Sequence, residues 1–311
     1  MRRTIFQGLN GNGITRVQSA SSINTYRQCP RKYFYQYIMK LETQPSIHLV
    51  RGKVAHSVLE DFFKIDLDKV SSDNYDFEFK IILHELLSRH WEKSADELSK
   101  LPMSGAEIES YFEETKEMVQ FWLLDFIGKL DAEIKGDKKG DAERDNIDNI
   151  DNRYDGDGGG KGGGKGLSFK EAFQNLSPRT EEHFISEELG VQGYIDAIHE
   201  DPCTGVVKII DYKTSKRDNI IDEYRLQLGI YSVLYLEKYN RMPTYAGLFF
   251  LKHGERLIEV DDELLRHAVD EIEKVHLSAV SDNIEDYPKK PSPLCKFRTG
   301  QCDFYCQCQK E

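Results

Sequence analysis

The fold of this chain depends on residues 190–213, which read GVQGYIDAIHEDPCTGVVKIIDYK. Two runs rich in β-forming residues, Val191–Ile198 and Val206–Lys213, flank the five residues DPCTG at 201–205. Proline and glycine in that break are typical of a turn, because proline interrupts the hydrogen bonding of a strand and glycine accepts backbone conformations that other residues avoid. The stretch therefore predicts a β-hairpin.

The predicted hairpin gathers three charged side chains on one face. Folding it about its midpoint sets Asp196 opposite Asp211, and directly opposed residues of antiparallel strands point to the same side. Lys213 shares that side, since alternate residues of a strand face the same way. A divalent cation between the two carboxylates would remove their repulsion and supply a Lewis acid. A solvated charged face with an incidental Asp–Lys pair is the alternative interpretation.

Length and charge limit the classes of protein to consider. With 311 residues, of which 39% are hydrophobic, the chain can bury a core in one large domain or in one domain plus a satellite. Its formal net charge of −12 argues against a protein that coats nucleic acid without specificity. The charge is compatible with a nuclease, because a metal site needs carboxylates and a basic contact surface can be local.

The sequence contains no run of about 18 apolar residues, which a membrane-spanning helix would need. Its first residues, MRRTIFQGLNGNG, lack the apolar segment of a signal peptide. We therefore expect no membrane partner and a cytoplasmic location. The six cysteines are then expected to be metal ligands or free thiols rather than disulfides.

Hydrophobic periodicity predicts helices and further strands around the hairpin. The expected helices are a short one capped within 21–24 and running to Cys29, an aromatic-rich one over Arg31–Leu41, one over Val50–Phe63 entered after Gly52, and Phe77–Leu98, Ala106–Leu130, Asp222–Tyr239 and Asp261–Val280. A strand is expected within 180–189, and a second hairpin over Tyr245–Leu251 and Arg256–Val260. Strands mixed with flanking helices predict the α/β or α+β class.

Three polar side chains on the predicted helices are candidates for a site. His56 lies beside an apolar stripe, while Gln227 and Tyr231 are four residues apart and share one face of their helix. Taken by themselves, a structural histidine and the polar edge of an amphipathic helix are the favoured interpretations. The aromatic residues near Tyr33 are likewise expected to pack in a core rather than to stack on bases.

Residues 131–166 are dominated by Asp, Lys, Asn and Gly and predict a flexible linker or surface loop. The segment contains most of a P-loop, from Gly159 to Gly164 and Lys165. Gly166 replaces the Ser or Thr that would bind magnesium, and no β-run precedes the motif. We therefore do not expect nucleotide binding here.

The tail, residues 291–311, concentrates four cysteines: Cys295, Cys302, Cys306 and Cys308. Thiolates this close in sequence are suited to zinc or to an iron–sulfur cluster. Two ligand sets are open at this point. The tail cysteines can form a self-contained knot, or three of them can join Cys29 and connect the two ends of the chain.

Several separate motifs fit one family. They are SSINTYRQCPRKYFYQY at 21–37, RGKVAHSVLE at 51–60, GYID at 193–196, IIDYKT at 209–214, QLGIY at 227–231 and the terminal cysteines. The motifs occur in the family's order. The sequence therefore resembles the RecB-like branch of the PD-(D/E)XK nuclease superfamily, and especially its iron–sulfur members, the CRISPR-associated RecB-like exonucleases and the AddB nuclease domain. The likeness covers most of the chain outside 65–180.

The resemblance implies a restriction-endonuclease-like α/β core, a mixed central sheet flanked by helices, with a helical insertion and a cysteine-rich metal-cluster region at the C-terminus. The implied organisation is an N-terminal helical part (1–64), the insertion (65–130), the linker (131–166), the nuclease core (167–290) and the tail (291–311). The core and the N-terminal part would together form the nuclease domain.

The resemblance also implies roles for single residues. His56, Asp196, Asp211 and the carbonyl of Tyr212 would bind Mg²⁺ or Mn²⁺, and Lys213 would orient or activate the attacking water. Gln227 and Tyr231 would border the site and contact DNA.

For the tail, the resemblance implies a [4Fe–4S] cluster held by Cys29, Cys295, Cys302 and Cys308, with Cys306 competing for the last place. The family usually has C-x2-C followed by a more distant cysteine, whereas here six, three and one residues separate the tail cysteines. That departure keeps Zn²⁺ as an alternative.

The expected function is a metal-dependent DNA nuclease, an exonuclease acting on single-stranded DNA or free ends, in DNA repair, recombination or CRISPR adaptation. Helicases or CRISPR-adaptation proteins are the expected partners. Two rival hypotheses are a DNA-end-binding accessory module with little cleavage and a zinc-stapled interaction protein.

Overall fold

A computed structural model describes residues 16–136, 166–297 and 300–310. In chain order the elements are β1 (Gln18–Ser19), α2 (Ala20–Gln28), α3 (Pro30–Tyr33), the π-helix η1 (Phe34–Ile38), α4 (Ile47–Phe62), the 3₁₀-helix η2 (Leu67–Lys69), α5 (Tyr75–Lys93), α6 (Ala95–Ser99), α7 (Gly105–Lys135), α8 (Phe169–Leu176), β2 (Arg179–Ser186), β3 (Val191–Glu200), β4 (Val207–Lys213), α9 (Asp222–Tyr239), β5 (Tyr245–Phe250), β6 (Gly254–Glu259), α10 (Asp262–Ser278), the 3₁₀-helix η4 (Ile284–Asp286), β7 (Lys296–Phe297), β8 (Gly300–Gln301) and α11 (Tyr305–Lys310).

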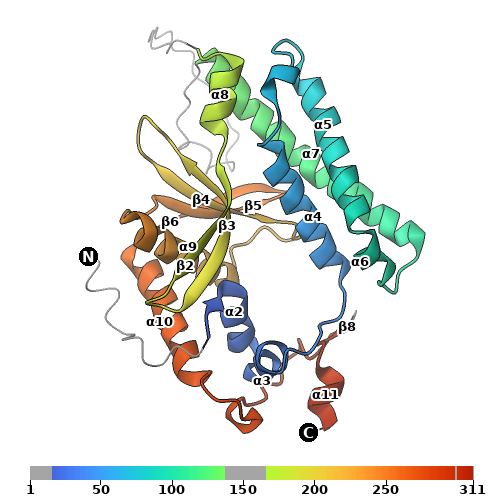
Figure 1. Cartoon of the computed structure of the whole chain (residues 1–311), viewed down its shortest axis with the longest axis vertical. Helices are drawn as coiled ribbons and strands as arrows, with labels where there is room; N and C mark the ends of the chain where they lie inside the picture. Colours follow the sequence, from blue (N-terminus) through green and yellow to red (C-terminus); the bar gives the residue numbers. More distant parts are fainter. Residues whose placement is uncertain (1–15, 137–165, 298–299, 311) are drawn as a thin grey trace, which may run out of the picture.

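The centre of the molecule is a mixed sheet, which confirms the expected α/β architecture (Figure 1). Strands β3, β4, β5 and β6 follow one another across it, with β4 and β5 parallel and the other two pairs antiparallel. Helix α9 connects the parallel pair, as a crossover connection requires. Strand β2 pairs antiparallel with β3, and the short β1 runs parallel to the start of β3.

Two apolar cores lie on opposite faces of the sheet. Helices α9, α10 and α2 pack with one face, where Ile209 and Leu248 point. Helices α4, α5, α7 and α8 pack with the other face, where Ile210 and Tyr212 point, and form the upper part of Figure 1. Alternation along β4 sends neighbouring residues to different cores, so β4 is buried on both sides.

The predicted hairpin is confirmed, and its register is the expected one because Ala197 pairs with Ile210. Its turn is stabilised by Asp201, whose Oδ1 accepts hydrogen bonds from the backbone N–H groups of Cys203 and Thr204. Gly205 completes the turn at a φ of 70°, a left-handed conformation that favours glycine.

Several helix limits differ from the predicted ones. The helix expected over Phe77–Leu98, for example, is two helices, α5 and α6, with a break at Ser94. The cap of α2 is Ser19, which forms a capping box with Ser22, rather than a residue of 21–24. Helix α4 begins at Ile47 rather than after Gly52, which lies inside it. Helix α7 continues to Lys135 and ends at Gly136 with a φ of 72°, so the first residues expected in the linker are helical.

The predicted linker and its partial P-loop otherwise fall on residues 137–165, outside the described residues. Tyr33 and Phe34 are buried in the α9-side core, as expected for packing residues. No helix among the described residues combines the length and apolar character needed to cross a membrane.

Candidate active site

The site lies where β3 separates from β4. Along one edge β3 pairs with β1 at residues 191–192 and with β4 at residues 197–200. The four residues between, GYID at 193–196, have no paired strand on that edge in the described part of the chain. The sequence motif thus marks an opening in the sheet, which we call the fork. Its backbone groups are free to bind side chains instead of a neighbouring strand.

On the α4 side, His56 bridges the two arms of the fork. Its Nδ1 lies 3.2 Å from Oδ2 of Asp196, and its Nε2 lies 2.8 Å from the carbonyl oxygen of Tyr212. Asp196 Oδ2 in turn accepts a 2.7 Å hydrogen bond from the backbone N–H of Tyr212. The carboxylate of Asp196 therefore takes the place of the strand pairing that begins at the next residue, Ala197.

On the α9 side, Lys213 and Asp211 form a close ion pair, with Nζ 2.5 Å from Oδ2. Gln227 of α9 holds both partners. Its Oε1 accepts a 3.0 Å hydrogen bond from Lys213, and its Nε2 donates to Asp211 Oδ1 at 2.9 Å. Nε2 also lies 2.9 Å from the hydroxyl of Tyr231. These residues lie in the same fork as His56 and Asp196, but the predicted ligand Asp211 is paired with Lys213 and is not in the close ligand group that contains His56 and Asp196.

Gln227 and Tyr231 make inward contacts. Tyr231 is 7% exposed, and its ring packs over Gly193. The described hydrogen bonds of Gln227 all go to Asp211, Lys213 and Tyr231. These contacts support a positioning role for both side chains, and their contact with DNA stays a prediction.

Glu181 of β2 is a site residue that the sequence analysis missed. The register of β2 with β3 sets it opposite Asp196, because its neighbours Thr180 and Glu182 pair with Ala197 and Ile195. Its φ of 49° is left-handed, which costs a residue with a Cβ about 1–2 kcal/mol. That conformation accompanies the entry of the Glu181 carboxylate into the site. The sequence predicts the strand that contains Glu181 but not its register with β3. Only that register identifies Glu181 as the neighbour of Asp196.

Three of these side chains are spaced to hold one metal ion. One ligand atom each of His56, Glu181 and Asp196 lies within 4.8 Å of the others. An imidazole nitrogen with carboxylate oxygens suits Mn²⁺, and an oxygen-rich set suits Mg²⁺. The contacts of His56 with a carboxylate and a carbonyl mark a position where positive charge is favoured. The residues therefore fit a divalent cation.

Burial and charge set the protonation of the fork. Burial alone would lower the pKa of His56, but Asp196 and then Asp211 raise it to about 9. Burial raises the pKa of Glu181 to about 7, and the nearby Asp196 adds to the rise. Metal-free, the fork therefore contains a positively charged histidine that counters the acidic residues around it.

The Lys213–Asp211 pair is also set by opposing effects. Burial would lower the pKa of Lys213, but the adjacent carboxylate of Asp211 raises it above its ordinary value. Burial raises the pKa of Asp211, and the ammonium of Lys213 opposes that rise. Lys213 is therefore a cation held in a partly buried position, suited to stabilise negative charge rather than to accept a proton.

The predicted cluster cysteines come from both ends of the chain. Cys29, Cys295, Cys302 and Cys308 are half-buried, whereas Cys306 is exposed. Burial raises the pKa of Cys302 and of Cys308, and the nearby Cys29 contributes to both rises. Cys295 adds to the rise at Cys308. Among the described residues, however, the cysteines form no group of three sulfurs as close as the ligand atoms of the fork.

Comparison with known proteins extends these observations. A search of the curated proteins finds no match. Among solved structures, one similar chain is a crystal structure of a "Putative exonuclease" from Eubacterium rectale, with 12% sequence identity and a TM-score of 0.49, covering 92% of this chain and 88% of that one. The family model of the PD-(D/E)XK nuclease superfamily matches residues 18–309, which include the fork, the ion pair and the tail. With nearly its whole length matched by that model, the chain belongs to the PD-(D/E)XK nuclease superfamily.

Proposed function

We propose that this chain is a metal-dependent deoxyribonuclease that hydrolyses phosphodiester bonds in single-stranded DNA or at free DNA ends, as an exonuclease. One observation carries the proposal. The buried ion pair of Lys213 with Asp211, held by Gln227, lies in the same fork as the ligand-like group of His56 and Asp196. A metal-dependent hydrolase of phosphodiesters can use both parts, a cation site and a fixed positive side chain beside it.

The residues that would hold Mg²⁺ or Mn²⁺ are His56, Asp196 and Asp211 with the carbonyl of Tyr212, and we add Glu181 to the set. A cation bound there would polarise the scissile phosphate and lower the pKa of a bound water. His56 has to lose the proton that it carries in the metal-free chain before its nitrogen can be a ligand.

The protein's own groups supply orientation and charge. Lys213 stays protonated next to Asp211 and so would stabilise the negative charge that develops on the phosphate, or position the attacking water. Gln227 fixes the direction of the Lys213 side chain through its amide oxygen. The hydroxyl of Tyr231 accepts a hydrogen bond from Gln227 Nε2. Burial raises the pKa of Tyr231, so this hydroxyl stays protonated.

We further place the chain in the RecB-like branch, with a [4Fe–4S] cluster on Cys29, Cys295, Cys302 and Cys308. Cys29 raises the pKa of Cys302 and of Cys308, and Cys295 raises the pKa of Cys308. These interactions support this set over one that contains the exposed Cys306. Zn²⁺ on the same cysteines is the alternative, as a tetrahedral four-sulfur site.

The cluster would be structural, since it would join the N-terminal helices to the tail. A role in DNA repair, recombination or CRISPR adaptation, with a helicase or adaptation proteins as partners, follows from the resemblance to that branch. A cytoplasmic location is part of the same proposal.

The direct test is cleavage of end-labelled single-stranded DNA in Mn²⁺, Mg²⁺ or EDTA, with wild-type protein and Lys213→Ala. Lys208→Ala is the matched control, because Lys208 lies on the same strand outside the fork. We expect metal-dependent cutting by the wild type and the control, lost in Lys213→Ala. Equal cutting by all three would place the activity elsewhere, and no cutting by a folded wild type would favour the DNA-end-binding module.

A further inference from the structure

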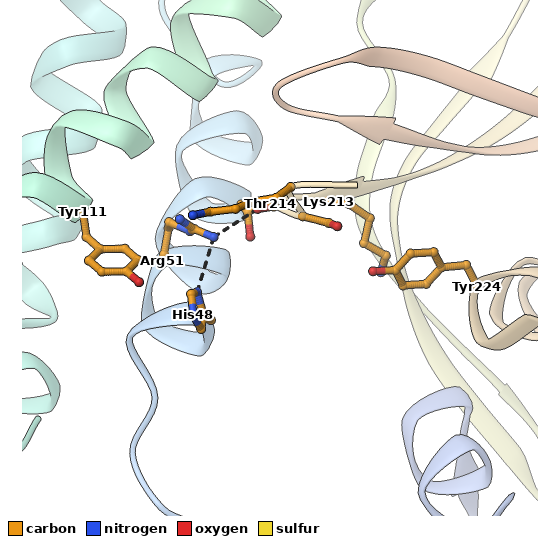
Figure 2. A pocket seen from close by; sticks show the side chains of 8 residues that line it. His48, Arg51, Tyr111, Lys213, Thr214 and Tyr224 are labelled. Carbon is orange, nitrogen blue, oxygen red and sulfur yellow. Dashed lines mark hydrogen bonds between the residues drawn. The ribbon is translucent and has the colours of Figure 1, made fainter. Parts of the chain in front are cut away.

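A cavity of about 510 Å³ opens beside Lys213, between the helical layer and the nuclease core (Figure 2). Helix α4 contributes His48 and Arg51, α7 contributes Tyr111, and α9 contributes Tyr224. The segment that follows β4 supplies the remaining wall. Lys213 lines the cavity and also belongs to the fork, so the cavity continues directly from the proposed catalytic centre. Its volume is in the range of pockets that hold one small ligand.

Positive charge prevails in the cavity wall. Arg51, Lys213 and Lys216 line it, whereas the carboxylates that pair with Arg51 and Lys213, those of Glu114 and Asp211, are not among the lining residues. Lys216 is exposed and forms no ion pair with any residue that the structure describes. The pKa of His48 is lowered by burial and further by Arg51 and Lys216, which is the effect of a local positive potential. An anion would be stabilised here.

Arg51 is fixed in place and still offers an unused donor. It is 3% exposed, and its guanidinium contacts Glu114 at 3.0 Å and donates to the carbonyl oxygen of Thr214 at 3.1 Å. Figure 2 shows it reaching from α4 to the segment after β4. Its Nε is buried without a hydrogen-bond partner among the described residues. A buried guanidinium with a free donor is a group for which a ligand oxygen is a natural partner.

Two tyrosine rings accompany these cations. Tyr111 lies on one side of the cavity and Tyr224 on the other (Figure 2). The guanidinium of Arg51 lies 5.3 Å from the centre of the Tyr111 ring, and Lys213 Nζ lies 5.0 Å from that of Tyr224. Cations combined with accessible aromatic rings are the chemistry that binds single-stranded nucleic acid, with phosphates on the cations and bases stacked on the rings.

We propose that this cavity binds the nucleotide next to the scissile phosphate of a single DNA strand, with its phosphate on Lys216 and Arg51 and its base against Tyr111 or Tyr224. The inference rests on the proposed function and narrows its substrate from single strands or free ends to an unpaired strand. A base can reach these rings when it is unpaired, whereas a base pair keeps its bases stacked inside the double helix. Tyr111 belongs to the helical insertion, so the insertion would take part in substrate selection.

Binding measured without cleavage tests the proposal. A fluorescent single strand of about 12 nucleotides is titrated with the full chain in EDTA and followed by anisotropy. The variants are Lys216→Gln and Tyr111→Leu. Lys69→Gln and Phe121→Leu are matched controls, because both residues are exposed and lie outside the cavity, and Phe121 is on α7 like Tyr111. A strand with an abasic site and a blunt duplex of the same length complete the set.

Lys216→Gln is expected to weaken binding about threefold to tenfold at low salt and to reduce the salt dependence by about 0.7 in the slope. Tyr111→Leu is expected to weaken binding of the intact strand at least about fivefold, but not of the strand whose abasic position occupies the cavity. Neither change should affect the duplex to that extent.

Wild-type affinity in both cavity variants would overturn this inference. If the wild type still cuts DNA in that case, the proposed function stands and the cavity has no part in it. A wild type that neither binds nor cuts overturns both. Equal losses for single strand and duplex would overturn the strand preference.

Discussion

At the scale of single residues, the amide of Gln227 connects α9 to the ion pair of Lys213 and Asp211. It accepts from Lys213 and donates to Asp211, so it fixes both ends of the pair at once. Asn would be too short to keep both contacts, and an apolar side chain would keep none. Under the proposed function, Gln227 is a positioning residue that would act on the reaction through Lys213 and Asp211.

Gln227→Met tests this role. We expect turnover to fall about 10- to 100-fold, the usual effect of removing a group that orients the groups around a metal site, with KM for DNA little changed. Gln192→Met on β3 is the control, since Gln192 binds His183 away from the fork. A rise in KM with unchanged turnover would instead assign Gln227 to DNA binding, as the resemblance implies.

Glu181 brings a further acidic group to a fork that already contains two carboxylates. Without metal, its charge is unfavourable because the carboxylate is buried and lies beside Asp196, and both effects raise its pKa. We therefore expect Glu181→Gln to stabilise the metal-free protein at pH 8 by about 1–2 kcal/mol. We expect the same variant to gain less than the wild type from added Mn²⁺, because it has lost a ligand.

Thermal unfolding in EDTA and in Mn²⁺ measures both effects of Glu181→Gln. Glu182→Gln is the matched control, since Glu182 points to Lys238 and Tyr239 rather than into the fork. The same metal-induced stabilisation in wild type and Glu181→Gln would remove Glu181 from the ligand set.

At the scale of elements, the hairpin and α9 were predictable and the fork was not. Helix α9 has the predicted limits, and β4 ends at the predicted Lys213. Local alternation and turn chemistry are enough to define such elements. The fork depends on β1, which pairs with β3 across more than 170 residues of chain. The left-handed Glu181 likewise depends on register between strands, which the sequence pattern of β2 does not contain.

Gly193 illustrates how packing between elements protects the site. A Cβ at this position would lie 2.8 Å from the ring of Tyr231 on α9. We expect Gly193→Ala to destabilise the protein by about 1–3 kcal/mol and to lower activity, because Tyr231 supports Gln227. Combining it with Tyr231→Leu should cost less than the sum of the two single changes.

Urea unfolding and turnover measure the effect of Gly193→Ala. Gly52→Ala in α4 is the contrasting control, because no atom lies within 4 Å of its added Cβ and alanine favours a helix. Additive losses in the double variant would show that Gly193 is not required for the approach of α9.

Helix α10 contacts the start of β3 through His276. This residue is buried, and its Nε2 lies 3.2 Å from the carbonyl oxygen of Gly190. Burial lowers the pKa of His276, so it is neutral in the folded protein while the unfolded chain binds a proton near pH 6.5. Its contribution to stability is therefore present above pH 6.5 and is lost as the pH falls below that value, by up to about 1.4 kcal/mol per pH unit.

His276→Gln should make the stability less dependent on pH between 7.5 and 5.5, because the amide can donate the same hydrogen bond without titrating. Urea unfolding at both pH values gives the comparison, with the exposed His84→Gln of α5 as control. An equal loss of stability on acidification in His276→Gln and wild type would contradict the assignment.

At the scale of the whole molecule, the two ends of the described chain are packed together. Arg31 of α3 donates to the carbonyl oxygen of Tyr287 at 2.8 Å, and the rings of Tyr33 and Tyr287 stack with centres 6.2 Å apart. Tyr35 packs on Phe304 of the tail. These contacts bring Cys29 close to the tail cysteines, and they do so over a separation in sequence that no local pattern could specify.

The cluster proposal predicts different results for neighbouring cysteines. Cys302→Ser should remove the broad visible absorbance of an iron–sulfur cluster from anaerobically purified protein, because it deletes a half-buried ligand near Cys29. Cys306→Ser should keep the absorbance, as should Cys203→Ser in the exposed hairpin turn.

Since the cluster would hold α2 and α3 against the tail, we expect its loss to lower the unfolding temperature and to expose the N-terminal helices to protease, while the fork keeps its metal response. Iron, sulfide and zinc analysis decides between an iron–sulfur cluster and a zinc site. Colourless wild-type protein with one equivalent of zinc would show that the site binds zinc. Loss of absorbance in Cys306→Ser but not in Cys308→Ser would show that Cys306, rather than Cys308, is the fourth ligand.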